Sequence, residues 1–420
     1  MTASVGDDLT AGPPEQGALA GLRVLDLSGP LGNYCGKLFA ELGADVVLVE
    51  PPDGTALRHQ PPYAGDQPGL ESSLPFRYNN TSKRSLRLDL EHPDGQQVFR
   101  ELAAGADLVI ETDSPGRMAA RGLGHGRLSR SNPALVTTSI TPFGQTGPYA
   151  DHEASDLVCL AMGGLLYLGG YADGPPVQAG QQQAYAAANL FGAVASMLAL
   201  TAAETTREGQ HVDVSVQESV VMGLENAAQF QDLEGHVRRR TGGRQWRAGA
   251  GVFPCADGYV YLLAGGIGGN RFWPNLIAWL DSEEVPRAAE LRGDQWGERE
   301  FVEAEENRDL FAEVFLPFAR QRTKADLYRD AQRWRVPLCP VSRPTDILRS
   351  AQLRHRDYFV SVDGPDGLPA VMPGAPYVLS GTPWRLQGRA PRLGEHSVEV
   401  LHELGCSAER VAELTRTGVI

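Results

Sequence analysis

Two short runs of apolar residues flank a helical pattern near the start of the chain. Residues 23–27 and 45–50 are rich in valine and leucine, which is typical of strands buried on both faces of a parallel sheet. The amphipathic stretch between them stops at Gly43, and glycine is common just past a helix end. The pattern therefore predicts a strand, helix, strand unit over residues 21–52.

The alternation of strand and helix patterns continues to about residue 220. We expect further strands at 85–90, 107–111, 134–140 and 210–216, with a helix at 93–104. This order predicts a doubly wound α/β domain built on a parallel sheet. Residues 174–203 carry no charge, but their many alanines and glycines make them only weakly hydrophobic, so we expect a helix buried in the protein and no membrane span.

The amino-acid composition of the chain changes after residue 225. Residues 236–247 form a basic run, which is either a solvated helix end or a clamp for an anion, and 252–263 predict a β-hairpin that turns at 256–258. The expected organisation is a disordered tail at 1–20, a large domain at 21–222, a small α+β domain at 225–330, a connecting segment at 331–389 and C-terminal helices within 390–420.

Composition narrows the class of protein. The chain has 420 residues, too many for one ordinary core, and its 38 Lys and Arg against 52 Asp and Glu give a net charge of −14. This acidic balance argues against nucleic acid and anionic membranes as partners. The five scattered cysteines fit reduced thiols in a cytoplasmic protein, and the nine histidines show no metal-binding spacing, so we expect no metal.

Glu50 closes the second strand, where dinucleotide-binding folds place an acid for the ribose. The nearby glycines are Gly29, Gly32 and Gly36, which do not have the spacing that lets the backbone approach a pyrophosphate. We therefore expect no NAD.

Seven segments over nearly the whole chain contain short motifs: residues 21–30, 38–51, 80–90, 144–164, 209–220, 336–341 and 390–405. These motifs resemble, in the same order, those of the class III CoA-transferases of the CaiB/BaiF family. The resemblance implies a large Rossmann-like domain that binds coenzyme A or acyl-CoA as substrate, a smaller domain, and C-terminal helices that return to the large domain. It also implies two subunits interlocked as a dimer.

In the family, CoA contacts come from a lysine in the motif at 80–85, from residues after the strand at 107–111, and from an aromatic residue near Gly144. The CoA-binding residues that the resemblance implies here are Lys83, Arg84, Thr112, Arg121 and Phe143.

The chain departs from the family at the position of its nucleophile. In family transferases an aspartate attacks the acyl-CoA thioester, because a carboxylate is both a nucleophile and a good leaving group. Tyr185 stands at that position, and no acid lies between Asp173 and Glu204. The family's racemases add a histidine, whose place is taken here by Ser155.

Three functions remain open from the sequence. In the first, the chain is one subunit of a heteromeric CoA-transferase, and a paralogous partner supplies the aspartate. In the second, it is a homomeric enzyme in which Tyr185, with Gln182 and Gln183, orients an acyl-CoA for dehydration, isomerisation, racemisation or lyase chemistry. Tyrosine has a pKa of about 10, which favours hydrogen-bond donation to a thioester oxygen over action as a base. In the third, the chain binds acyl-CoA without catalysis.

Overall fold

The computed structural model describes residues 17–420 apart from 225–226, 243–244, 266–271, 365–366 and 368, and most of the expected tail at 1–20 lies outside these residues. The chain forms two compact units. The first contains the described residues up to Leu165 together with 180–225 and 354–420, and the second contains 166–179 and 226–353. These units differ from the expected domains, because 166–179 join the second unit and the segment 331–389 is divided between the two.

The first unit is built on a six-stranded parallel sheet, as the apolar runs predict. Its strands are β1 (Arg23–Asp26), β2 (Asp45–Glu50), β3 (Arg84–Arg87), β4 (Leu108–Glu111), β5 (Val136–Thr141) and β6 (His211–Ser215). They lie in the order β3-β2-β1-β4-β5-β6, and every neighbouring pair is parallel. This is the strand order of a doubly wound nucleotide-binding fold, so the predicted fold class is confirmed.

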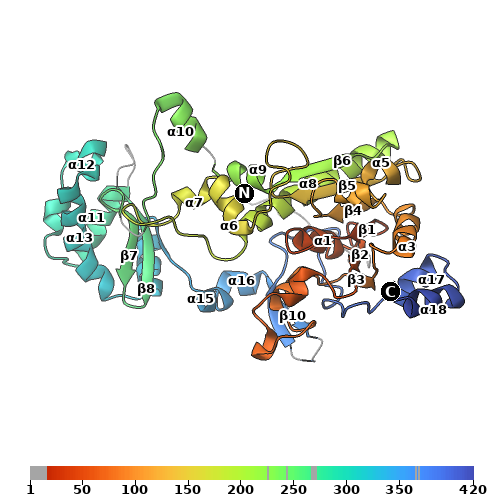
Figure 1. Ribbon diagram of the computed structural model, residues 1–420. Helices are drawn as coiled ribbons and strands as arrows, with labels where there is room; N and C mark the ends of the chain where they lie inside the picture. Colours follow the sequence, from red (N-terminus) through yellow and green to blue (C-terminus); the bar gives the residue numbers. More distant parts are fainter. Residues whose placement is uncertain (1–16, 225–226, 243–244, 266–271, 365–366, 368) are drawn as a thin grey trace, which may run out of the picture. The chain divides into compact units, whose positions relative to one another are not determined.

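Helices cover both faces of this sheet (Figure 1). On one face, α1 (Asn33–Ala40) packs on β1 and β2, and α8 (Gln183–Thr206) packs on β5 and β6. On the other face, Leu25, Val47 and Val109 share a core with α3 (Pro93–Ala103), α17 (Ser397–Glu403) and α18 (Ala408–Arg416). The C-terminal helices therefore return to the sheet, as the family resemblance implies.

α8 is buried along one side only, which corrects the expectation of a buried helix. Gly192 and Ser196 face the sheet, whereas Leu190, Val194 and Leu198 are at least half exposed. In the described part of the chain it is the one helix long and apolar enough to cross a membrane by length and composition alone. The small residues of α8 let the helix pack closely on β5. A Cβ on Gly192 would lie only 2.9 Å from Ile140 Cδ1.

Shorter elements complete the first unit. They are α2 (Leu74–Asn79), α4 (Arg117–Ala120), α5 (His125–Leu128), α6 (Asp156–Met162), α9 (Val216–Met222), the 3-10 turns η1 (Ala56–His59) and η2 (Ala64–Asp66), and an antiparallel pair of strands, β10 (Phe359–Asp363) and β11 (Pro369–Pro373).

The second unit has an antiparallel sheet of β7 (Ala250–Cys255), β8 (Gly258–Leu263) and β9 (Leu338–Pro340). The first two strands are the predicted hairpin, which is confirmed. Its core is aromatic and centres on Trp279, Trp296, Phe311 and Phe315. Its remaining elements are α10 (Ala227–Glu234), α11 (Phe272–Ser282), η3 (Ala288–Leu291), η4 (Asp294–Gly297), α12 (Arg299–Glu303), α13 (Glu305–Arg320), α14 (Lys324–Trp334) and α15 (Pro344–Leu348). Two short helices, α7 (Leu165–Leu168) and α16 (Ala351–His355), lie where the chain passes between the units.

Candidate active site

The order of the strands reverses between β1 and β4, and sheets of this type bind ligands outside the carboxyl ends of the strands at that point. Thr112 follows β4, and its Oγ1 accepts a hydrogen bond of 2.9 Å from the backbone N–H of Gly29, which follows β1. A Cβ on Gly32 would lie 2.6 Å from both Ser28 Cβ and Thr112 Cγ2. Thr112 therefore holds the tight turn that leads into α1.

Lys83 lies beneath this turn and is 3% exposed. Its Nζ donates to Asp26 Oδ2 at 2.7 Å, the carbonyl oxygen of Asn33 at 2.7 Å and Asn80 Oδ1 at 2.8 Å. An ammonium group has three donors, and all three are used. Lys83 therefore neutralises the buried Asp26 and supports the turn from below, and its contact with CoA stays a prediction.

Arg84 and Arg121 are also paired with carboxylates. Arg84 binds Asp45 through two hydrogen bonds of 2.9 and 2.7 Å and Glu403 of α17 at 2.8 Å. Arg121 binds Asp113 at 2.6 Å and also contacts Glu91. Arg84 thus ties β3 to the C-terminal helices, and a phosphate could reach Arg121 only by competing with its two acids.

Phe143 lies just after the carboxyl end of β5 in a small aromatic cluster. Its ring centroid is 5.9 Å from that of Tyr149 and 6.4 Å from that of His152. Tyr149 is 46% exposed, so these rings offer an apolar surface beside the strand ends.

Tyr185 occupies the first turn of α8, and its backbone N–H donates to Asp156 Oδ1 at 3.0 Å. Its hydroxyl lies 3.5 Å from the carbonyl oxygen of Ala154. Burial, together with electrostatic interaction with Cys159 and Asp156, raises the pKa of Tyr185 to about 12. The phenol is therefore neutral near pH 7 and is neither a nucleophile nor a base there.

The neighbouring glutamines do not contact the Tyr185 hydroxyl. Gln183 donates its side-chain amide to the carbonyl oxygen of Gly180 at 2.9 Å, and Gln182 is exposed. Both residues, which the resemblance places at the active-site turn, lie at the amino end of α8 without an acid–base partner in common.

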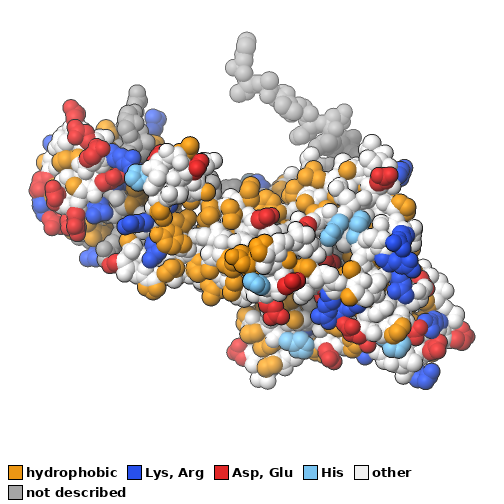
Figure 2. Space-filling model, turned by 45° about the horizontal axis from the view of Figure 1, so that its top comes forward, with side chains coloured by type: hydrophobic (Ala, Val, Ile, Leu, Met, Phe, Trp, Pro, Cys, Tyr) orange, Lys and Arg blue, Asp and Glu red, His pale blue; other side chains and the backbone are white. Residues whose placement is uncertain are grey.

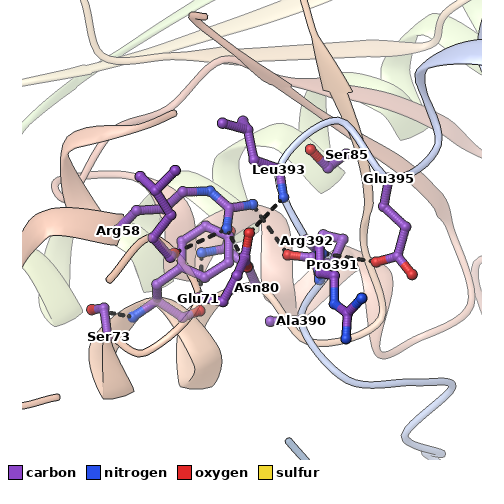
Figure 3. A network of polar contacts seen from close by, with 12 residues as sticks. Arg58, Glu71, Ser73, Asn80, Ser85, Ala390, Pro391, Arg392, Leu393 and Glu395 are labelled. Atoms are coloured by element: carbon purple, nitrogen blue, oxygen red, sulfur yellow. Dashed lines mark hydrogen bonds and ion pairs between the residues drawn. The ribbon is translucent and has the colours of Figure 1, made fainter. Parts of the chain in front are cut away.

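The Glu50 side chain is fully buried, and its hydrogen-bond partners all lie within the protein. Its carboxylate accepts two hydrogen bonds from Arg58, at 2.6 and 2.8 Å, and one from Ser85 Oγ at 2.7 Å. Arg58 also donates to Glu71 at 2.8 Å and to the carbonyl oxygen of Pro391 at 3.1 Å (Figure 3). Glu50 is therefore part of a structural network, and no oxygen is turned toward a ribose.

The basic run at 236–247 lies in the second unit, with 243–244 outside the described residues. The guanidinium of Arg240 donates to the carbonyl oxygens of Tyr167 at 3.2 Å and Gly174 at 2.8 Å, and that of Arg238 stacks 4.0 Å from the ring of Phe230. Arg240 thus anchors a loop of its own unit and does not form an anion clamp. Within the described ranges, no group of three or more His, Cys, Asp or Glu side chains is placed to hold a metal ion.

Comparison with known proteins agrees with this fold. The model of the family described as CoA-transferase family III matches residues 19–397. The chain is 44% identical over 401 residues to the succinyl-CoA:(R)-benzylsuccinate CoA-transferase subunit BbsE of Thauera aromatica, covering 95% of this chain and 97% of the relative. It is 31% identical to the beta subunit of succinyl-CoA–L-malate CoA-transferase of Chloroflexus aurantiacus, covering 96% and 98%. A solved CAIB/BAIF family protein of Brucella suis matches with a TM-score of 0.81 at 27% identity, over 93% of this chain and 100% of that one.

Proposed function

This chain belongs to CoA-transferase family III, and we propose that it is the subunit of a heteromeric CoA-transferase that does not supply the nucleophile. The complex would move CoA between succinyl-CoA and a second carboxylic acid, since succinyl-CoA is the donor named for the relatives reported above. One observation carries the proposal: a neutral, partly buried tyrosine stands where the family resemblance places a carboxylate nucleophile.

The chemistry requires that carboxylate. An aspartate oxygen attacks the thioester carbon and the CoA thiolate leaves, which gives an acyl–aspartate anhydride. The acceptor carboxylate then attacks the aspartyl carbonyl carbon of this anhydride and expels succinate, which gives an anhydride between the acceptor and aspartate. The CoA thiolate attacks the acceptor's acyl carbon, which forms the product thioester and releases the aspartate carboxylate. A phenol with a pKa of about 12 lacks both the negative charge for the first step and the leaving ability for the next. We therefore assign the aspartate to a partner subunit.

An exposed apolar face supports an obligate partner. Side chains on α6, α8 and α9, all in the first unit, are between 40% and 68% exposed: Leu157, Met162, Leu190, Phe191, Val194, Leu198, Val221 and Met222. Figure 2 shows hydrophobic side chains gathered on the molecular surface where these helices lie. Monomeric soluble proteins rarely leave so large an apolar surface uncovered. We propose that a paralogous subunit, interlocked with this one, covers it in the cytoplasm.

The test compares the purified chain with its complex. The chain is expressed alone and together with a family III paralogue that carries the aspartate, and the transfer of CoA from succinyl-CoA to candidate acids is followed by mass spectrometry. We expect activity only from the complex, complete loss on changing the partner's aspartate to asparagine, and an unchanged rate with Tyr185→Phe in this chain. Full transfer by the chain alone would refute the proposal.

The same experiment addresses the two alternatives. A homomeric enzyme centred on Tyr185 would form dehydrated, isomerised or cleaved acyl-CoA products and would lose them in Tyr185→Phe. A pure acyl-CoA-binding protein would bind CoA in calorimetry and leave the rate of the paralogue unchanged when added to it.

A further inference from the structure

A cavity of about 560 Å³ lies in the first unit against β4, β5 and β6. It falls in the size range of small-molecule sites. Its walls include Glu111, Thr137 and Ser139 from the strands and several residues of α4, α5 and the loop between them.

This cavity is on the face of the sheet opposite α8 and Tyr185. Thr138 Oγ1 is 2.6 Å from Ser196 Oγ of α8, so Thr138 points toward that helix. Side chains alternate along a strand, and Thr137 and Ser139 therefore point to the other face, where they line the cavity. The cavity is thus separated from the Tyr185 turn by the thickness of the sheet.

The inner wall carries a chain of polar groups. Ser139 is hydrogen-bonded to Glu111, and its Oγ lies 2.8 Å from His211 Nε2. The rings of His211 and His125 stack with centroids 5.9 Å apart and planes at 17°. Burial lowers the pKa of both histidines, so the two stacked rings form a neutral, flat surface of hydrogen-bonding groups near pH 7.

Two arginines stand at the mouth. Arg127 and Arg130 line the cavity and are exposed, and within the described ranges neither has an ion pair with a carboxylate. This differs from Arg84 and Arg121, which are held by acids, and it occurs in a chain with a net charge of −14. Met118 and Leu123 add an apolar wall beside them.

We propose that this cavity binds a small organic anion, with its carboxylate or phosphate on Arg127 and Arg130 and its apolar body between Met118, Leu123 and the stacked imidazoles. Guanidinium groups bind both kinds of oxyanion through paired N–H donors. Gly124 and Gly126 also line the cavity. Because glycine has no side chain, this part of the wall leaves room for a flat ring.

Binding is measured by calorimetry on the full-length chain with four probes. Phenylacetate and phenyl phosphate share an aromatic body and differ in the anion, benzyl alcohol has the body without the charge, and inorganic phosphate has the charge without the body. We expect one of the two aromatic anions to bind at least about tenfold more tightly than benzyl alcohol and inorganic phosphate, because a charge-assisted pair contributes that much. The preferred anion distinguishes an organic acid from a phosphate ester as the ligand.

Two variants locate the binding. Gly126→Leu fills the cavity from a position where an added Cβ meets no atom within 4 Å, so it should fold and abolish binding. Arg127→Gln combined with Arg130→Gln should weaken binding about tenfold or more. Arg117→Gln is the matched control, since Arg117 is exposed on the neighbouring α4 and does not line the cavity.

Binding of neither aromatic anion, equal binding of benzyl alcohol, or binding that survives Gly126→Leu would each overturn the proposal. These outcomes are independent of the CoA-transfer assay, because the variants leave Tyr185 and its face of the sheet unchanged.

Discussion

The buried acid Glu111 should make the stability of the first unit depend on pH. It is 5% exposed at the end of β4, and its carboxylate accepts a hydrogen bond of 2.7 Å from the backbone N–H of Asp113. Burial outweighs this bond and the bond from Ser139, and it raises the pKa of Glu111 from 4.5 to about 7. At 1.36 kcal/mol per pH unit, the difference corresponds to about 3 kcal/mol.

The direction of this pH dependence follows from the state, folded or unfolded, in which Glu111 binds its proton more tightly. Below pH 4.5 the acid is protonated in both the folded and the unfolded chain, and its titration does not lower the free energy of unfolding. As the pH rises from 4.5 to about 7, the unfolded chain releases the proton while the folded chain retains it, so the free energy of unfolding falls. Above about pH 7 the loss is complete and constant. Glu111→Gln keeps the shape and an acceptor oxygen but has no proton to release.

The assay is urea unfolding of the natural chain and Glu111→Gln over this pH range. Titrating groups that do not interact with Glu111 are common to both proteins and largely cancel in the difference. We expect the variant to gain about 3 kcal/mol relative to the natural chain between pH 4.5 and about pH 7. A difference that stays constant with pH would refute the reasoning, and a carboxyl ¹³C titration of Glu111 with its midpoint near the ordinary value would refute it directly.

Three further changes test the packing and the partner surface. Lys83→Met should lower the free energy of unfolding in urea by about 3–5 kcal/mol, because it leaves Asp26 buried without its cation. Adding Asp26→Asn should recover part of this loss, and full stability of the single variant would contradict the prediction. Arg58→Met should cost a similar amount for the same reason at Glu50, with unchanged stability as the contrary result. Val194→Asp, at a site that is 59% exposed, should leave the circular dichroism of the chain unchanged and weaken association with the partner subunit at least about tenfold in analytical ultracentrifugation; unchanged association would remove α8 from the interface.

The elements of the fold were predictable because their signals are local. Continuous apolar runs marked β1, β2 and β4, and the turn at 256–258 marked the hairpin of the second unit. The domain limits were less accessible, because residues 354–420 join the first unit through contacts with partners more than 300 positions away, such as Arg84 with Glu403.

The sequence offered candidate site residues, but it did not show the partners that these residues have in the structure. The motif matched Tyr185 to the position of the family's aspartate, but the sequence did not show that the side chain is partly buried and its pKa raised. The family resemblance implied Lys83 as a CoA contact, but the sequence did not show that its buried partner is Asp26, which lies 57 positions earlier. The cavity beside Ser139 and His211 gave no signal at all, since these residues meet only when β5 and β6 pair.

The return of the C-terminal segment to the sheet has a consequence for biosynthesis. β3 receives its ionic partner from α17, and the backbone N–H of Asp89, just beyond β3, donates to the carbonyl oxygen of Val419 at 2.8 Å. The strands β1, β2 and β3 are synthesised early, but β3 and one side of the core stay uncovered until residues 397–420 have left the ribosome. We expect slow, late folding and a need for chaperones that shield the nascent chain, as for other proteins whose contacts join distant parts of the sequence.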